Sequence, residues 1–468
     1  MIALALMTVL AADGAGYFPL PKQLKVKPES IKPKPFDLTI KKPEKSQLPN
    51  GMKLYLVEDH AAPLVTVRAL VQLGTHDDPM AKLGLAELLF EVLASGGAGE
   101  RNADQLDELL EFQAADLFAS AGDEYSSVTL SMRAEDVEKL LPIFADVLMK
   151  PRFQGDRFDV SVNKTLENIR RRADRPDGIA SRALYKAVFG PTSLIAREST
   201  PLTVKAVKVE DLKTTHARTF GPVSTALLVT GDFDKAKVTE KLTALFGAWK
   251  GGELPKRDYG ASPKLERRVI YVPKQTPQVK IRIGGPGYKR LDPVEYPMRL
   301  VSTALGSFGL GRLYREIRDE RGYAYSAWCQ AGSGPTTGIF MAGFDSKPET
   351  AAPAIEVALP ILEGKDGPLT KPELVTAADM AVNSFAFRFD SAGKIVWERA
   401  VLDLFGYPDD YLDTFRDKIA KVDEKAAQEA RARLGGDFQI VVVGPEGKVG
   451  DLSKFGPVTR ITDVEAWK

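Results

Sequence analysis

The stretch "KLGLAELLFEVLASGG", Lys82–Gly97, is nearly all apolar, yet it carries Glu87 and Glu91 one helical turn apart. Helical spacing places four small or polar residues on one face, Gly84, Glu87, Glu91 and Ser95. Two exposed carboxylates at this spacing repel by only about 0.2–0.5 kcal/mol, but burying both without a cation would force one to take up a proton. The stretch therefore predicts a core helix whose polar face looks into a cleft. A solvated stripe on a packed helix is the alternative.

Composition describes a globular chain with no general attraction to nucleic acid or lipid. Of its 468 residues 44% are hydrophobic, and the length suggests roughly three domains or two large ones. Lys and Arg total 64 and Asp and Glu total 63, so no net field recruits nucleic acid or an anionic membrane. The single cysteine, Cys329, rules out an internal disulfide and a multi-cysteine metal site. The three histidines, His60, His76 and His216, are too widely spaced for one helix to present two of them to a metal.

Two N-terminal segments precede the folded region. Residues 1–20 open with "MIALALMTVLAADGAG", which is too short to span a bilayer but has the length of a secretory signal, although no Lys or Arg comes before it. We expect a periplasmic or secreted protein with no membrane span in the mature chain; a packed or disordered N-terminal segment is the alternative. Residues 21–47 are rich in Pro and Lys and predict an extended arm, either a strap over a partner subunit or a solvated linker.

Residues 48–250 predict a unit of mixed strands and helices. Two β-rich runs, "GMKLYLVED" and "LVTVRALVQLG", are joined by a short turn, as in a hairpin. The elements expected after them are a helix at 103–113, a strand at 126–132, helices at 135–150 and 157–174, and a closing strand, turn and helix over 224–250.

A second unit, residues 265–468, repeats this order after a linker at 251–264, where glycine, proline and charge coincide. The elements expected in it are a strand at 278–287, helices at 292–306 and 311–322, and strands at 324–332 and 337–345. The strand at 438–447 and the segment after it mirror the closing strand, turn and helix of the first unit. The repeated order predicts a duplicated α+β unit.

The order of these elements is similar to that of the pitrilysin/insulinase metallopeptidases, the M16 or inverzincin family. The resemblance rests on "LGLAELLFEVLASGG", "LENIRRRADRP" and "TGDFD" and extends from about Leu48 to the C-terminus. It implies an α+β chain of two tandem homologous α/β-sandwich domains. Each would be an antiparallel-rich sheet with helices packed on one face, the LuxS/MPP-like fold.

The resemblance also implies that the metal site is degenerate. Active members carry H-x-x-E-H on this helix, two zinc-binding histidines and a glutamate that activates water. Here Glu87 and Glu91 stand at the histidine positions and Phe90 at that of the base, and Glu167, 76 residues after Glu91, occupies the position of the third ligand. Phe90 cannot take a proton, and zinc prefers imidazole and thiolate. We expect this chain to bind no zinc; a weak calcium or magnesium site is the alternative.

The stretch "GRLYREIRDERGYAYS", 311–326, carries the second resemblance. From the residues alone, Arg318 lies on an ordinary charged helix face and Tyr325 could be a core residue of a strand. In the family, R-x-x-x-G-x-x-Y followed by Ser holds an R/Y pair, and Arg318, Gly322, Tyr325 and Ser326 match it. The resemblance implies that Arg318 and Tyr325 bind substrate and donate to the oxygen of the scissile carbonyl as negative charge grows on it.

Together the two motifs resemble one subunit of a two-chain enzyme. In two-chain bacterial members one subunit carries H-x-x-E-H, and the other has a degenerate zinc motif and the R/Y pair. We therefore expect a non-catalytic subunit of a heterodimeric zinc metallopeptidase that acts on peptides, with the zinc in the H-x-x-E-H partner. A silent scaffold, like the core proteins of the respiratory cytochrome complex, and a peptide-binding protein that works alone are the alternatives.

Two further stretches bear on substrate contact. "DLFAS", 116–120, puts Phe118 before Ala119 where active halves of the family carry Asn-Ala on an edge strand, so we expect no substrate contact there. "GSFGLGRL", 306–313, lies where the mitochondrial processing peptidase has a glycine-rich loop, but it matches no phosphate-binding pattern. We interpret it as a turn, with substrate contact as the alternative.

Overall fold

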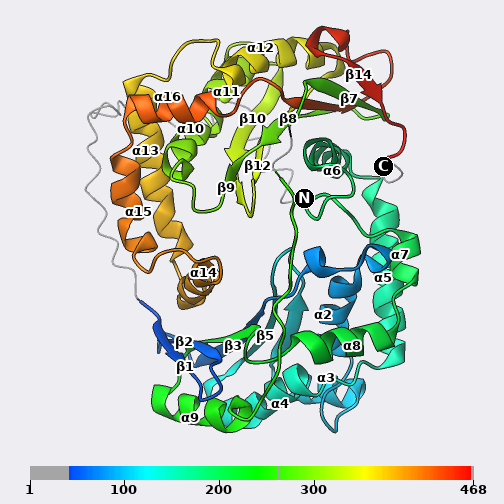
Figure 1. Ribbon diagram of the computed structural model, residues 1–468, viewed down its shortest axis with the longest axis vertical. Coiled ribbons are helices and arrows are strands. Elements are labelled where there is room, and N and C mark those ends of the chain that lie inside the picture. Colours follow the sequence, from blue (N-terminus) through cyan, green and yellow to red (C-terminus); the bar gives the residue numbers. More distant parts are fainter. Residues whose placement is uncertain (1–41, 262–263, 465–468) are drawn as a thin grey trace, which may run out of the picture. The chain divides into compact units, whose positions relative to one another are not determined.

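The computed structural model describes residues 42–261 and 264–464, and two six-stranded sheets organise them (Figure 1). We call residues 42–250 the first half and residues 265–464 the second half. The first sheet has the order β1-β2-β6-β3-β5-β4 and the second β10-β12-β8-β13-β7-β14. Their strands are β1 (Glu44–Gln47), β2 (Lys53–Glu58), β3 (Leu64–Val71), β4 (Asp116–Ser120), β5 (Ser126–Arg133), β6 (Thr225–Gly231), β7 (Arg268–Pro273), β8 (Val279–Pro286), β10 (Ala324–Ala331), β12 (Ile339–Ser346), β13 (Gln439–Gly444) and β14 (Val458–Arg460). This is the α+β architecture of two sheets with packed helices that the sequence predicts.

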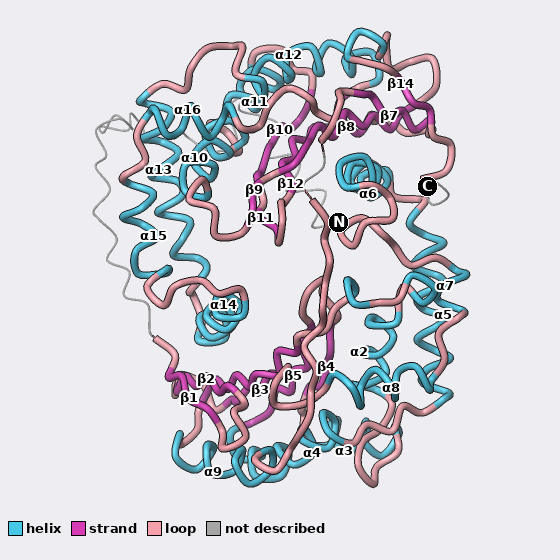
Figure 2. Tube along the Cα trace, viewed as in Figure 1, coloured by secondary structure: helices cyan, strands magenta, loops and turns pink. Residues whose placement is uncertain are grey.

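Helices of the first half cover the first sheet (Figure 2). They are α2 (Leu85–Ser95), α3 (Ala103–Phe112), α4 (Val137–Met149), α5 (Gly155–Arg172), α7 (Pro201–Lys205), α8 (Val209–Thr219) and α9 (Lys235–Phe246). One apolar core joins these helices to alternate residues of the strands, and Leu88, Leu89 and Phe90 of α2 lie in it. The expected helix at Lys82–Gly97 is therefore present, and its apolar face is buried as predicted.

The expected hairpin between the first two long strands is wrong. β2 and β3 are not neighbours, because β6 lies between them, parallel to β2 and antiparallel to β3. The sequence "TALLVTG" of β6 is almost wholly buried, which suits a central strand. Residues 59–63 have the length of a hairpin turn, but they connect two strands that are not neighbours in the sheet. Glu44–Gln47, expected within the extended arm, forms the edge strand β1 against β2.

The second half repeats the plan with additional helices. They are α10 (Glu295–Gly306), α11 (Arg312–Tyr314) followed by a π-helix (Arg315–Asp319), α12 (Ala351–Glu363), α13 (Lys371–Phe385), α15 (Tyr411–Ala420) and α16 (Glu424–Ala432). β9 (Tyr288–Lys289) and β11 (Ser333–Gly334) form a small parallel pair. The segment after β13 does not mirror the helix α9, since it contains a 3₁₀ turn, Ser453–Phe455, and then the strand β14. The stretch 306–313 contains a turn between α10 and α11, as interpreted.

The two halves exchange one helix each. Helix α6 (Pro176–Phe189), from the first half, packs on β8 and β13 of the second sheet, where Ala180, Ala183 and Leu184 are fully buried. Helix α14 (Ala392–Leu404), from the second half, packs on β2 and β6 of the first sheet. Each sheet thus receives a helix from the other half, an exchange that helical periodicity cannot reveal.

The segment after residue 250 has no regular structure, as expected of a linker, but it is tied to the first half. The Arg257 guanidinium donates to both carboxylate oxygens of Asp77, at 2.7 and 2.6 Å. The Tyr259 hydroxyl lies 3.2 Å from Nδ1 of His76. The domain limits 48–250 and 265–468 stay predictions, and the expected signal and most of the arm lie outside the described residues. Within residues 42–261 and 264–464, no helix is long and apolar enough to cross a lipid bilayer.

Candidate functional site

The helix α2 begins on a buried carboxylate. Asp78, 5% exposed, accepts the backbone N–H groups of Gly84 at 2.8 Å and Ala86 at 2.9 Å. Gly84 takes a φ of +103°, a left-handed conformation that favours glycine at this start. Removal from water raises the pKa of Asp78 to about 7, although the two N–H groups favour its charged form. By fixing where α2 begins, the Asp78 cap also fixes the positions of Glu87 and Glu91 on that helix.

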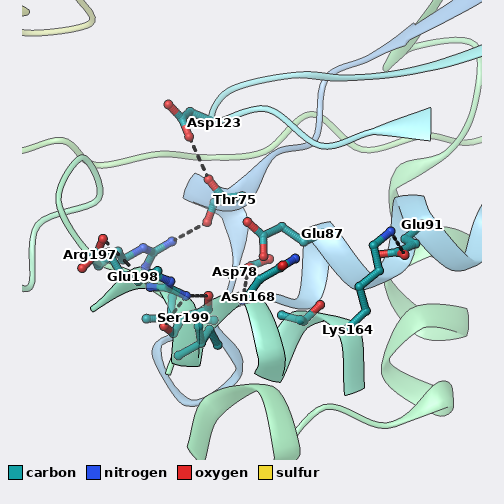
Figure 3. A pocket seen from close by; sticks show the side chains of 15 residues that line it. Thr75, Asp78, Glu87, Glu91, Asp123, Lys164, Asn168, Arg197, Glu198 and Ser199 are labelled. Atoms are coloured by element: carbon teal, nitrogen blue, oxygen red, sulfur yellow. Dashed lines mark hydrogen bonds and ion pairs between the residues drawn. The ribbon is translucent and has the colours of Figure 1, made fainter. Parts of the chain in front are cut away.

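A cavity of about 470 Å³ opens beside α2 and α5, and we call it the first-half pocket (Figure 3). Glu87 and Glu91 both line it, as the sequence predicts for the polar face of α2. The other lining residues are Thr75, Asp78, Leu83, Gly84, Asp123, Lys164, Thr165, Asn168, Ile169, Arg172, Arg197, Glu198 and Ser199.

The two glutamates of α2 have different surroundings. Glu91 forms an ion pair with Lys164 of α5, with 2.6 Å between Oε1 and Nζ. Glu87 forms no ion pair or hydrogen bond with any other described residue, and its carboxylate is reached from the pocket. The pKa of Glu87 is raised, chiefly because nearby protein atoms remove part of the hydration of its carboxylate, although the residue is exposed; Arg172 opposes the shift, and Asp123 and Glu91 add to it.

The structure does not bring Glu167 to the other two glutamates. It accepts from Arg170 at 2.5 Å and Arg171 at 2.6 Å, and these hydrogen bonds lower the pKa of its carboxylate. The next residue, Asn168, lines the pocket instead, because successive helical residues point about 100° apart. Helical spacing could have identified Lys164 and Asn168, four residues apart on the pocket face of α5, but sequence reasoning missed both.

The residues at the positions that the resemblance assigns to the metal ligands do not suit zinc. Phe90, which the resemblance sets at the position of the base, is 1% exposed, and its ring centre lies 5.7 Å from that of Phe220. The face of α2 offers the carboxylates of Glu87 and Glu91 in place of imidazoles, and the ammonium of Lys164 already neutralises Glu91. Across residues 42–261 and 264–464, no group of three or more His, Cys, Asp or Glu side chains could hold a metal ion.

The second half brings Arg318 and Tyr325 together, and we call this pair the Arg/Tyr site. Arg318 lies in the π-helix and Tyr325 in β10, and the guanidinium carbon of Arg318 lies 5.5 Å from the centre of the Tyr325 ring. Gly322, with φ of +64°, allows the tight turn between the two elements. The seven-residue spacing therefore places both side chains side by side, as the family resemblance implies.

The Arg/Tyr site faces solvent. Tyr325 is 75% exposed and the side chain of Arg318 is 38% exposed. Arg318 donates to the hydroxyl of the buried Tyr314, whose ring centre lies 4.8 Å from the guanidinium carbon, and to Oδ1 of Asp319 at 3.2 Å. A guanidinium carries five N–H donors, so donors remain for a ligand after these contacts.

A buried arginine supports the segment that carries Arg318. The Arg312 side chain, 8% exposed, donates to both carboxylate oxygens of Glu373, each at 2.6 Å, and to Oδ2 of Asp366 at 2.8 Å. Burial opposes ionisation of Glu373, but the hydrogen bonds from Arg312 and Thr370 prevail and lower its pKa to about 2. This network anchors α11 to α13, and sequence reasoning did not single out Arg312.

Sequence profiles of two domains match the chain. The profile described as "Insulinase (Peptidase family M16)" matches residues 53–198, and that described as "Peptidase M16 inactive domain" matches residues 206–378. The chain belongs to the M16 peptidase family. The matches cover the first-half pocket and the Arg/Tyr site, so the resemblance that both stretches carry is confirmed.

Relatives of this M16 chain span most of its length. An uncharacterized zinc protease of Streptomyces coelicolor is 23% identical over 414 residues, which cover 86% of this chain and 89% of the relative. Among solved structures, a peptidase M16 inactive domain from Pseudomonas fluorescens has a TM-score of 0.76 and 21% identity, covering 86% of this chain and 98% of its own. The periplasmic protease PqqL of Escherichia coli has a TM-score of 0.70 and 15% identity, and the match covers 95% of this chain and 50% of PqqL. These structures show that the M16 fold is shared.

The strand β4 lies at the edge of the first sheet, beside α2. Phe118 of β4 is 48% exposed, and its ring stands where active halves of the family carry a smaller, polar side chain. We keep the absence of substrate contact on β4 as a prediction.

Proposed function

We propose that this M16 chain is a non-catalytic subunit that completes the active site of an H-x-x-E-H partner by supplying Arg318 and Tyr325. The observation that carries the proposal is the Arg/Tyr site itself, two hydrogen-bond donors that lie side by side and are exposed to solvent. The partner would hold the zinc and supply the nucleophile, and the substrates would be peptides.

The first half lacks the base that the H-x-x-E-H motif supplies in the family. Phe90 has no proton acceptor and lies in the apolar core, and Glu91 is neutralised by Lys164. Activation of water requires a base within hydrogen-bond reach of the water that loses its proton. A chain built in this way depends on another subunit for attack on the peptide bond.

The second half can stabilise the charge that such an attack creates. As the scissile carbonyl carbon becomes tetrahedral, negative charge grows on its oxygen, and the Arg318 guanidinium and the Tyr325 hydroxyl both donate without giving up a proton. Because Arg318 is held between the rings of Tyr314 and Tyr325, it needs little reorganisation to reach the oxygen.

The test is proteolysis by the reconstituted pair. A candidate H-x-x-E-H subunit is purified and mixed with this chain, and the rate of peptide cleavage is measured for the unchanged chain, for Arg318→Ala and for Arg315→Ala. We expect Arg318→Ala to lower kcat by about 10²–10³. Arg315 is the matched control, because it lies on the same π-helix, is exposed and pairs only with Glu316, at 3.6 Å. Full activity of Arg318→Ala would favour the scaffold function instead.

We further propose that the chain works outside the cytoplasm. The support is the N-terminal sequence and the fold shared with a protein described as periplasmic. N-terminal sequencing of the protein from a periplasmic fraction would test this, and recovery of the intact N-terminus from the cytoplasm would contradict it.

A further inference from the structure

We propose that the first-half pocket binds a single organic cation, an ammonium or guanidinium group, and that Glu87 is the residue that holds it. That the cation belongs to a peptide rests on the proposed function; that the pocket takes a cation rests on its own charges. A site that no longer suits a metal ion would then serve as a recognition site.

The pocket has one charged side chain without a partner. Five acidic and three basic side chains line it. Asp78 caps α2, Glu91 pairs with Lys164, and Asp123 accepts the Thr75 hydroxyl at 3.1 Å. Glu198 lies 3.1 Å from Lys186. Only Glu87, among the acidic residues described in the pocket, has neither an ion pair nor a hydrogen bond.

The basic residues of the pocket are engaged elsewhere. Lys164 is paired with Glu91, and Arg197 donates to the backbone oxygen of His76 at 2.6 Å. Arg172 donates to the backbone oxygen of Ser199 at 3.0 Å and to its hydroxyl at 2.9 Å. Glu87 is therefore the carboxylate of the pocket that has no contact to give up before it binds a cation.

The position of Glu87 suits a ligand that enters from solvent. Figure 3 shows its side chain among Thr75, Asp78 and Asn168, apart from the ion pair of Glu91 and Lys164. The amide of Asn168 and the hydroxyl of Thr75 offer further polar contacts to a group bound at Glu87. A cavity of about 470 Å³ exceeds the space of a bare ion and falls in the range of organic ligand sites.

A divalent ion would be held poorly at this position. Calcium takes six to eight oxygen ligands, usually with more than one carboxylate, and Lys164 already occupies the second carboxylate of α2. A monovalent organic cation needs one carboxylate and directed hydrogen-bond acceptors, which the pocket provides. Of the two kinds of cation, the ammonium or guanidinium group fits the charge that Glu87 leaves uncompensated.

Calorimetry on the purified full chain tests the proposal with three peptides. The first is acetyl-Gly-Ala-Lys-Ala-Gly-amide, the second has norleucine in place of lysine, and the third is the norleucine peptide with a free amino terminus. We expect one or both cationic peptides to bind at least about tenfold more tightly than the neutral one, since a hydrogen bond to a charged group is lost with the cation. The first and third peptides distinguish a side chain from an amino terminus as the source.

Two variants locate the effect. Glu87→Gln should abolish the preference for a cation, whereas Glu167→Gln should keep it, because Glu167 pairs with Arg170 and Arg171 and does not line the pocket. Arg318→Ala should also keep it, so failure of this proposal and failure of the proposed function are separate results. Equal binding of charged and neutral peptides, absence of binding, a preference that survives Glu87→Gln, or stoichiometric uptake of Mn²⁺ or Ca²⁺ would overturn the proposal.

Discussion

The first-half pocket and the Arg/Tyr site differ in where their charged groups find partners. In the pocket every acidic side chain except Glu87 has an ion pair or a hydrogen bond within the chain, and Phe90, which the resemblance sets at the position of the base, belongs to the core. At the Arg/Tyr site two donors stand in solvent, with Tyr325 75% exposed. The comparison shows that most charged groups of the first-half pocket are engaged within the chain, whereas the second half presents two donors to solvent.

A buried ionisable side chain supports each site, an acidic one in the first half and a basic one in the second. Asp78 holds the start of α2, and Arg312 holds α11 against α13. Buried charges are costly unless they are paired and hydrogen-bonded. Replacing either residue should therefore destabilise the element that it holds.

Arg312→Met should have the largest effect on stability. Loss of the guanidinium leaves Glu373 and Asp366 without their common partner, and breaking a buried ion pair costs about 3–5 kcal/mol. Chemical denaturation with urea would measure the loss. Arg321→Met is the control, because its pair with Glu316 is 38% and 31% exposed and should contribute less than about 1 kcal/mol. Equal losses in the two variants would show that the Arg/Tyr site has no special support.

Tyr325→Phe should lower the cleavage rate of the reconstituted pair by about 10²–10³, because one of the two donors to the carbonyl oxygen is lost. The stability of the chain should not change, since the residue is largely exposed and its hydroxyl has no partner among the described residues. Tyr323→Phe, two residues earlier in the same turn, serves as the control and should keep the full rate. Full activity of the reconstituted enzyme with Tyr325→Phe would show that the Tyr325 hydroxyl takes no part in the proposed mechanism.

The sequence predicts the repeated plan of the fold because local periodicity survives in most elements. The helices α3, α4 and α5 and the strand β5 lie within one or two residues of the expected limits. Neighbour relations are harder, because β6 enters between β2 and β3 from more than 150 residues away in the chain. The exchanged helix α6 was not expected at all, since nothing in its amphipathic pattern says which sheet it covers.

The contact between Arg318 and Tyr325 could be predicted, because one short motif contains both residues. The residues that line the first-half pocket could not all be predicted, because this depends on the direction in which each side chain points. Arg318 and Tyr325 meet because a short helix, Gly322 and a strand follow one another within seven residues. Glu167 satisfies the spacing of the third ligand, but one step along α5 turns Asn168 into the pocket instead. The ion pair of Glu91 and Lys164 links α2 to α5, and sequence spacing alone cannot show a contact between two helices.

Asp78 should make stability depend on pH. Its pKa in the folded chain is about 7 and near 3.8 in the unfolded chain, so the folded state binds the extra proton between these values. The stabilisation is complete below about pH 4 and is lost as pH rises through 7, with a slope of at most about 1.4 kcal/mol per pH unit. Unfolding free energies from pH 4.5 to 7.5 should fall more steeply for the unchanged chain than for Asp78→Asn. Parallel curves would show that Asp78 is ionised throughout and that α2 begins on a charged cap.

Gly322→Ala should lower the stability modestly and should link that loss to the Arg/Tyr site. The φ of +64° is unfavourable for alanine by about 1–2 kcal/mol, and nothing lies within 4 Å of the added methyl group, so backbone strain is the only cost. Gly155→Ala is the matched control, because its surroundings are equally open and it has no left-handed φ, so its stability should be unchanged or slightly higher. Gly322→Asn should recover part of the loss, since asparagine tolerates this conformation. If the turn sets the distance between Arg318 and Tyr325, Gly322→Ala should lower the cleavage rate of the reconstituted pair, and Gly155→Ala should not. Equal rates for the two variants would show that the contact between Arg318 and Tyr325 does not depend on this turn.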